Sequence, residues 1–262
     1  MNEHMPTVLY REMDGVAIIR LNRPLLLNAM NSEMLLGLTA AIDSAREDTK
    51  VRAVLLAATG RGFCAGAELA HLSDSEPADA GETLRRYYHP VVLGMRGLPK
   101  PIVVAVNGVA AGAGLSLVLA ADVVIASREA KFCAAFSRIG LVPDSGCTYF
   151  LPRIVGDMRA RALVLLAERI GAEEAKQQGL VWKVTAPELL DTEALELAKR
   201  FAAMPTRALG LAKEALEASH GANLEQQLEL EARLQSEAAL TSDFAEGVSA
   251  FLEKRSPVFL GS

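Results

Sequence analysis

Two loops of small residues stand out, because each follows an apolar run that is typical of a buried strand. They read FCAGAEL at residues 63–69 and NGVAAGAGLSL at residues 107–117. Small side chains leave backbone N–H groups accessible, and the second loop runs into an expected helix whose first amides have no internal acceptor. Such amides can stabilise a negative charge that develops on an oxygen. Close packing of a helix on a strand through glycine and alanine is the alternative interpretation.

A dinucleotide site is a second possibility, because the second loop lies between a strand and a helix. Its glycines, Gly108, Gly112 and Gly114, do not have GxGxxG spacing. The next strand also begins too early for an acidic residue about 20 positions further on to meet a ribose. The spacing therefore argues against NAD.

Composition and charge exclude other classes. The three cysteines have no CxxC spacing and the four histidines no HExxH spacing, which argues against a metal site. A net charge of -5 does not favour nucleic acid or an anionic membrane as a partner. The first ten residues do not resemble an export signal, and no apolar run reaches about 18 residues. We therefore expect a cytoplasmic, globular protein.

The segments that must position the loops alternate between strand and helix patterns. Residues 7–21 predict a β-hairpin around Asp14 and Gly15. Helical spacing runs from about Met34 to Ala45, with Asn31 or Ser32 as N-cap. Strands are expected at 51–59, 101–107 and 122–127, and helices at 82–96 and up to about residue 120. This order predicts an α/β fold with a largely parallel sheet.

The pattern becomes helical after residue 187. Segments are expected at 188–203, 205–219, 223–239 and 241–254. We therefore divide the chain into an α/β core at 1–200 and a C-terminal helical region at 201–262. The apolar faces of these helices must pack on the core or on an identical subunit.

Several motifs together resemble the enoyl-CoA hydratase/isomerase (crotonase) superfamily. They are NRPLLLNAMN, FCAGAEL, PKPIVVAVNGVAAGAGLSL, FSRIGLVPDSGCTYFLPRIVG and FAEGVSAFLEKRSPVF, so the resemblance spans residues 7–260. The later motifs are most similar to the 1,2-epoxyphenylacetyl-CoA isomerases of phenylacetate degradation. The resemblance implies a crotonase-like (ββα spiral) core, an acyl-CoA thioester as substrate, no cofactor beyond this coenzyme A, and a homotrimer or dimer of trimers.

The same resemblance implies that the amides of Ala67 and Ala113 form an oxyanion hole for the thioester enolate. Family hydratases activate water with two glutamates, and the corresponding positions here hold Ser116 and Phe136. Phenylalanine can neither hold a water nor carry a proton. The resemblance also places Ala65, Gly66, Leu69, Gly112 and Phe136 beside the substrate.

Asp144, in GLVPDSG, stands where the ring-opening isomerases carry their acidic residue. A lone carboxylate can take a proton from C2 and return it at C4. We expect the apolar neighbours Phe136, Leu141 and Val142 to raise its pKa. Capping of a helix that starts near Ser145 is the alternative.

Other candidates follow from the same resemblance. Arg23 and Lys254 correspond to positions that meet the nucleotide phosphates of CoA, the latter across subunits. Glu68 either lines the CoA channel or is an exposed loop carboxylate. His89 either lines the substrate site or lies on the surface, whereas in related dehalogenases a histidine at this position activates water.

The sequence thus predicts an acyl-CoA isomerase that acts on ring-epoxidised phenylacetyl-CoA or a 3-enoyl-CoA. Enoyl-CoA hydration, arylacyl-CoA dehalogenation and acyl-CoA binding without catalysis remain the alternatives.

Overall fold

The main sheet forms the centre of the core. The computed structural model describes residues 5–68 and 79–262, and within these ranges the sheet has six strands in the order β1-β2-β3-β4-β6-β9. The strands are β1 (Val8–Met13), β2 (Val16–Leu21), β3 (Ala53–Ala58), β4 (Ile102–Val106), β6 (Val123–Ser127) and β9 (Lys183–Thr185). All neighbours pair in parallel except β1 and β2. The predicted largely parallel sheet is confirmed.

The hairpin at the start of the chain has a local cause. Asp14 and Gly15 both adopt left-handed backbone conformations, with φ of 54° and 77°. Two such residues in succession make the tight turn whose twist matches that of the flanking strands. Met13 consequently pairs with Val16, and the predicted hairpin is confirmed.

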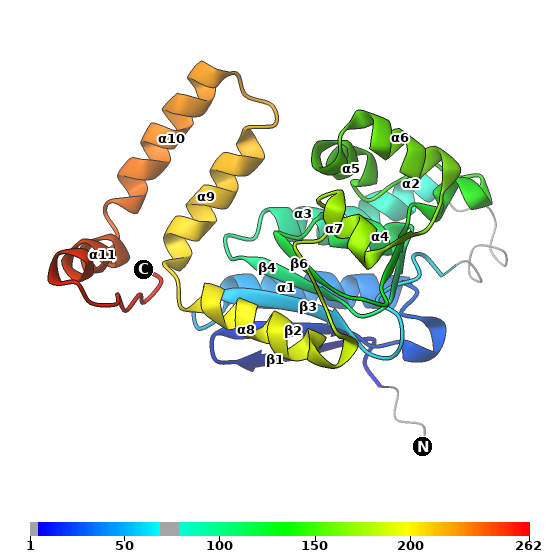
Figure 1. Cartoon of the computed structure of the whole chain (residues 1–262), viewed down its shortest axis with the longest axis horizontal. Coiled ribbons are helices and arrows are strands. Elements are labelled where there is room, and N and C mark those ends of the chain that lie inside the picture. Colours follow the sequence, from blue (N-terminus) through cyan, green and yellow to red (C-terminus); the bar gives the residue numbers. More distant parts are fainter. Residues whose placement is uncertain (1–4, 69–78) are drawn as a thin grey trace.

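Helices cover both faces of the sheet (Figure 1). Alternate residues of β3 point to opposite sides, so Val54 and Leu56 pack in one apolar cluster, whereas Ala53 and Leu55 pack in the other. Helices α1 (Ser32–Glu47), α3 (His89–Arg96) and α4 (Ala113–Leu119) contribute to the first cluster. Helix α8 (Leu190–Ala202) covers the second with residues spaced four apart. Of the two predicted N-cap residues, Asn31 is the one that caps α1.

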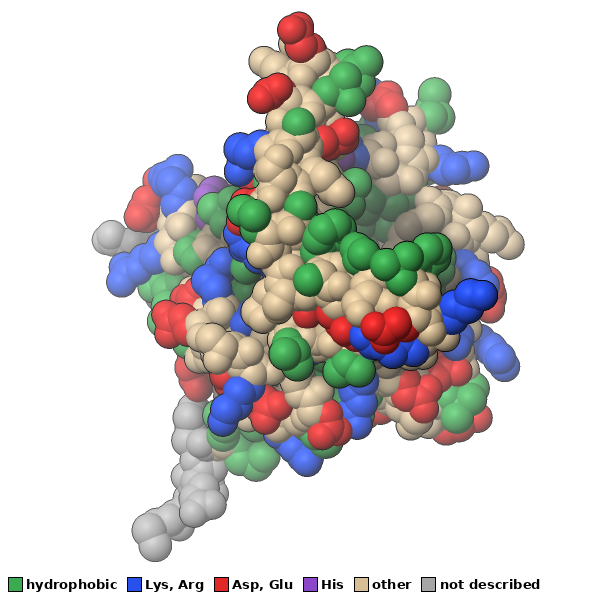
Figure 2. Space-filling view, turned by 90° about the vertical axis from the view of Figure 1, so that its left-hand side faces the viewer, with side chains coloured by type: hydrophobic (Ala, Val, Ile, Leu, Met, Phe, Trp, Pro, Cys, Tyr) green, Lys and Arg blue, Asp and Glu red, His purple; other side chains and the backbone are tan. Residues whose placement is uncertain are grey.

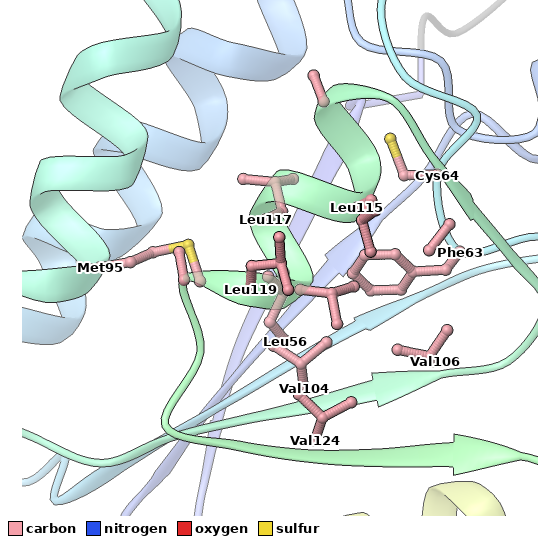
Figure 3. Close-up of a cluster of buried hydrophobic side chains, with 14 of the residues drawn as sticks. Leu56, Phe63, Cys64, Met95, Val104, Val106, Leu115, Leu117, Leu119 and Val124 are labelled. Carbon is pink, nitrogen blue, oxygen red and sulfur yellow. The ribbon is translucent and has the colours of Figure 1, made fainter. Parts of the chain in front are cut away.

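Helix α4 is anchored deeply in the first cluster. Leu115 lies beside Phe63, and Leu119 lies towards Leu56 of β3 and Val104 of β4 (Figure 3). Because the whole helix is buried, its first residue is held in a fixed position relative to the sheet.

The structure also contains a second, smaller sheet that was not predicted from the sequence. It consists of β5 (Val109–Ala111), β7 (Lys131–Cys133) and β8 (Ile170–Gly171), and β5 occupies part of the segment that we expected to be a turn. Strands this short carry too few residues for the alternation on which strand prediction depends. This sheet ties the second small-residue loop to the first through a bridge between Cys64 and Ala110.

The helix expected at 82–96 is divided into three pieces. They are α2 (Ala80–Thr83), a π-helical turn at Leu84–Tyr88, and α3. Pro90 has no N–H to donate to the preceding turn, and the amide of His89 donates to Leu84 instead. The remaining core helices are α5 (Cys147–Val155), α6 (Asp157–Leu166) and α7 (Ala172–Gln177).

The predicted C-terminal helices are present as α9 (Thr206–Ala218), α10 (Leu224–Ala238) and α11 (Ser242–Glu253). Helices α9 and α10 form an antiparallel pair that projects from one end of the core (Figure 1). Large apolar side chains are exposed on this region, among them Leu224, Leu228, Phe251 and Leu252. Figure 2 shows hydrophobic side chains on the face of the molecule at this end. Within the described ranges, no helix is long and apolar enough to cross a membrane.

Candidate active site

Glycines allow the two small-residue loops to touch. A Cβ atom on Gly114 would lie only 2.4 Å from the carbonyl oxygen of Cys64, and one on Gly66 would lie 2.9 Å from that of Ala111. Gly66 also has a φ of 101°, which other residues rarely adopt. The amide of Ala111 donates to the Cys64 carbonyl oxygen across a distance of 2.9 Å. The loops are therefore in backbone contact, which no side chain at these glycines would permit.

The amides of Ala67 and Ala113 lie on either side of this contact. A Cβ atom on Gly66, the residue before Ala67, would lie 3.6 Å from the nitrogen of Ala113. Ala113 is the first residue of α4, so its amide has no acceptor within the helix. Neither amide donates to an acceptor anywhere in the described part of the chain. Both residues line the same cavity, so their amides can donate to a ligand there.

A cavity of about 490 Å³ opens beside these amides. Of the candidate site residues named from the sequence, seven line it: Ala65, Gly66, Ala67, Gly112, Ala113, Phe136 and Asp144. They come from both loops, from the 3-10 helix at Ala135–Ile139 and from the segment before α5. Residues far apart in the chain therefore form one concave site.

The backbone around Asp144 directs its carboxylate into this cavity rather than onto a helix. Ser145 and Gly146 have φ values of 51° and 84°, so the chain turns sharply before α5 begins at Cys147. No described side chain caps α5. The helix-capping alternative for Asp144 is therefore wrong.

Burial raises the pKa of Asp144, and this is its largest perturbation. Two weaker effects lower the pKa, namely a hydrogen bond of 2.9 Å from the Ser145 hydroxyl to Oδ1 and the charge of His89. The predicted direction is confirmed. Phe136, which is only 5% exposed, and Leu141 line the same cavity, but Val142 is 79% exposed and was wrongly counted among the apolar neighbours.

Ser116 connects helix α4 to the segment that carries Asp144. Its side chain is fully buried at 0% exposure, and its hydroxyl donates to the backbone carbonyl oxygen of Asp144 across 3.0 Å. The amide of Cys147 donates to the same oxygen at 2.9 Å. The residue that replaces a hydratase glutamate thus holds the Asp144 backbone against α4.

The variant Ser116→Ala tests whether the hydrogen bond from Ser116 to the Asp144 carbonyl oxygen positions Asp144. We expect kcat to fall by about tenfold with little change in KM, since loss of a buried hydrogen bond costs about 1–3 kcal/mol and releases the Asp144 segment. Steady-state kinetics with the 3-enoyl-CoA substrate that the sequence leads us to expect measure both constants. Ser127→Ala, at a buried serine in β6 outside the cavity, is the matched control. Equal loss in both variants would contradict a specific role for Ser116.

His89 and Tyr88 are close enough to Asp144 to interact with it electrostatically. His89 is exposed and lines a neighbouring cavity of about 340 Å³ together with Ser145 and Gly146, but it does not line the main cavity. Tyr88 is buried, and burial followed by the charge of Asp144 raises its pKa. The sequence analysis did not single out Tyr88, because its spacing from the buried Val91, Val92 and Met95 is that of an ordinary core residue on a helix.

Arg23 and Glu68 form an ion pair outside the cavity lining. Arg23 Nη1 lies 2.8 Å from Glu68 Oε2, and each side chain is 15% exposed. Arg23 Nη1 also donates to the carbonyl oxygen of Ala29 at 2.6 Å. The expectation of an exposed Glu68 is therefore wrong. This pair braces the chain directly after Ala67.

One further candidate does not line the cavity. Lys254 is exposed and follows α11, in the helical region that projects away from the core. Leu69 lies outside the described residues. Over 5–68 and 79–262, no three His, Cys, Asp or Glu side chains gather in a way that could hold a metal ion.

Comparison with known proteins identifies the family. Residues 11–262 match the model of the enoyl-CoA hydratase/isomerase family, so the chain belongs to this family. Its predicted crotonase-type fold is confirmed by a crystal structure described as a putative enoyl-CoA hydratase/isomerase from Mycobacterium abscessus. The two share 41% sequence identity and a TM-score of 0.93, over 97% of this chain and 100% of the other.

Two relatives are equally similar but have different names. The 1,2-epoxyphenylacetyl-CoA isomerase of Escherichia coli is 45% identical over 98% of this chain and 99% of its own. A probable enoyl-CoA hydratase of Rhodobacter capsulatus is also 45% identical, over 97% and 98%. The chain is thus an enzyme of the enoyl-CoA hydratase/isomerase family that acts on acyl-CoA thioesters, as the family does.

Proposed function

We propose that this enzyme is an acyl-CoA isomerase in which Asp144 alone moves the proton. The thioester oxygen accepts hydrogen bonds from the amides of Ala67 and Ala113, which makes the C2 hydrogen acidic. Asp144 takes this proton, the double bond shifts through the enolate, and the carboxylic acid returns the proton at C4. The acceptor and donor are the same carboxyl group, so no second acid is needed.

One observation carries this proposal: among the described residues that line the cavity, Asp144 is the one carboxylate. Phe136 fills the position where a hydratase has a glutamate, and buried Ser116 fills the other. Water therefore has no carboxylate pair to activate it, whereas proton transfer between two carbons needs one base.

The substrate is an acyl group with an acidic C2, either ring-epoxidised phenylacetyl-CoA or a 3-enoyl-CoA. The name of the E. coli relative supports the first. The name of a 35% identical protein of Streptococcus mutans, a trans-2-decenoyl-[acyl-carrier-protein] isomerase, supports a double-bond shift.

Hydration is the second candidate, because the R. capsulatus relative is called a probable hydratase. Incubation of the purified protein with 3-enoyl-CoA, 2-enoyl-CoA and 4-chlorobenzoyl-CoA separates the possibilities by product. We expect 2-enoyl-CoA from the first and little 3-hydroxyacyl-CoA from the second. Faster hydration than isomerisation would refute the proposal, and release of chloride would identify a dehalogenase.

Assembly and location are proposed on the same basis. The exposed apolar side chains of α10 and α11 support a homotrimer or dimer of trimers formed through residues 201–262. In such an assembly, the exposed Lys254 of one subunit would meet CoA bound to another. We place the enzyme in the cytoplasm.

The pH dependence follows from the raised pKa of Asp144. Asp144 must be ionised to remove a proton, so kcat/KM should fall as the pH drops through its pKa. Because burial raises this pKa, the fall should begin at a higher pH than for an exposed aspartate. Loss of the positive charge in His89→Leu should move the fall to still higher pH. A pH profile of both proteins measures this, and identical profiles would contradict the coupling.

A further inference from the structure

Three cationic side chains line the cavity in addition to the groups that serve proton transfer. They are Lys131 of β7, Arg138 of the 3-10 helix and Arg169, which directly precedes β8. None was singled out by the sequence, because isolated basic residues at these separations form no motif. All three are exposed and thus accessible to a ligand.

The three groups converge on one short segment, residues 167–171. Arg138 donates from Nε and Nη2 to the carbonyl oxygen of Ala167, at 3.1 and 2.7 Å. Lys131 pairs with Gly171 across the small sheet, and its Nζ lies 3.5 Å from the point where a Cβ of Gly171 would be. Arg169 lies between these two contacts in the chain. Three segments that are distant in the sequence thus place their positive charges on the same wall of the cavity, next to residues 167–171.

This wall carries uncompensated positive charge. None of the three side chains has a carboxylate within ion-pair distance in the described ranges. The chain as a whole has a net charge of -5, so a concentration of cations is unexpected from composition. Like charges in a concave, partly apolar cavity repel one another and raise the local potential until an anion binds.

We propose that Lys131, Arg138 and Arg169 bind an anionic group of the substrate, a phosphate of CoA or a carboxylate on the acyl group. Arg138 is held in place by the carbonyl oxygen of Ala167 and keeps further N–H groups for a ligand, whereas Lys131 and Arg169 supply the other two positive charges. The proposal rests on the proposed function only in that the ligand is an acyl-CoA. It differs from the expected phosphate contact at Arg23, whose guanidinium is paired with Glu68.

The test uses the full chain with Lys131→Ala and Arg169→Ala combined, leaving Arg138 because it also holds Ala167. Calorimetric titration gives Kd for hexanoyl-CoA, for S-hexanoylpantetheine, which lacks the phosphates, and for adipyl-CoA, which adds a terminal carboxylate. Arg159→Ala combined with Lys176→Ala is the control. It removes the same charge from exposed residues that do not line this cavity.

If the cluster binds phosphate, the variant should bind hexanoyl-CoA about tenfold more weakly and S-hexanoylpantetheine unchanged. If it binds an acyl carboxylate, the loss should be about tenfold larger for adipyl-CoA than for hexanoyl-CoA. Equal affinities of variant and wild type, equal weakening of all three ligands, or the same loss in the control would overturn the proposal. These ligands require no turnover. Failure of the proposed function would appear instead as wild-type protein that binds none of them or isomerises nothing.

Discussion

Asp144→Asn is expected to abolish isomerisation, with a loss of kcat of about 100- to 10,000-fold. The amide has nearly the same shape as the carboxyl group but cannot accept the C2 proton. The amide oxygen of the new side chain would still accept the hydrogen bond from the Ser145 hydroxyl that now reaches Oδ1 of Asp144. The site should therefore keep its geometry, and acyl-CoA affinity should be unchanged.

Two measurements make this result decisive. Turnover of a 3-enoyl-CoA measures the chemistry, and calorimetric titration with hexanoyl-CoA measures binding. Asp157→Asn, at an exposed aspartate of α6 outside the cavity, serves as a control and should keep full activity. If Asp144→Asn retained turnover, Asp144 could not be the group that transfers the proton.

Gly114→Ala is expected to cost about 100- to 1000-fold in kcat, the usual effect of losing one oxyanion donor. The new Cβ would lie 2.4 Å from the Cys64 carbonyl oxygen and 2.9 Å from its Sγ, so the two loops must move apart. The amides of Ala67 and Ala113 could then no longer reach the same oxygen. Overpacking of this kind also lowers the free energy of unfolding by about 1–3 kcal/mol.

Gly221→Ala is the matched control, because nothing lies within 4 Å of the added atom and Gly221 lies between α9 and α10. Its kcat should equal that of the wild type. Thermal unfolding of both variants shows whether Gly114→Ala remains folded at the assay temperature. A folded Gly114→Ala protein with full activity would contradict the backbone account of enolate stabilisation.

The fold was predictable where local pattern and structure agree. Asp14 and Gly15 specify the first hairpin, and helical spacing defines α9, α10 and α11 within a few residues. The small sheet was missed because its pairing depends on segments that lie far apart in the chain, such as Lys131 and Gly171. The π-helical turn before Pro90 was missed because it preserves the apolar pattern of an ordinary helix.

The site was predictable from family motifs more than from residue spacing. Residue spacing pointed to two small-residue loops but did not decide between an anion site and close packing. The close approach of Gly66 to Ala111 depends on the folded structure and cannot be predicted from the sequence. Burial of Glu68 was not predictable, because its partner Arg23 lies 45 residues earlier in the chain. The position of Asp144 depends on the unusual backbone of Ser145, which no propensity would suggest.

Transfer of hydrogen within one acyl group can be followed directly with an isotope. A 3-enoyl-CoA labelled with deuterium at C2 is converted in a single turnover in ordinary water, and the product is analysed by mass spectrometry. Since one carboxyl group serves both carbons, we expect part of the deuterium at C4 with wild-type enzyme and far slower product formation with Asp144→Asn. A product formed equally fast by both proteins, in which the hydrogen added at C4 comes entirely from solvent, would contradict the single-carboxylate mechanism.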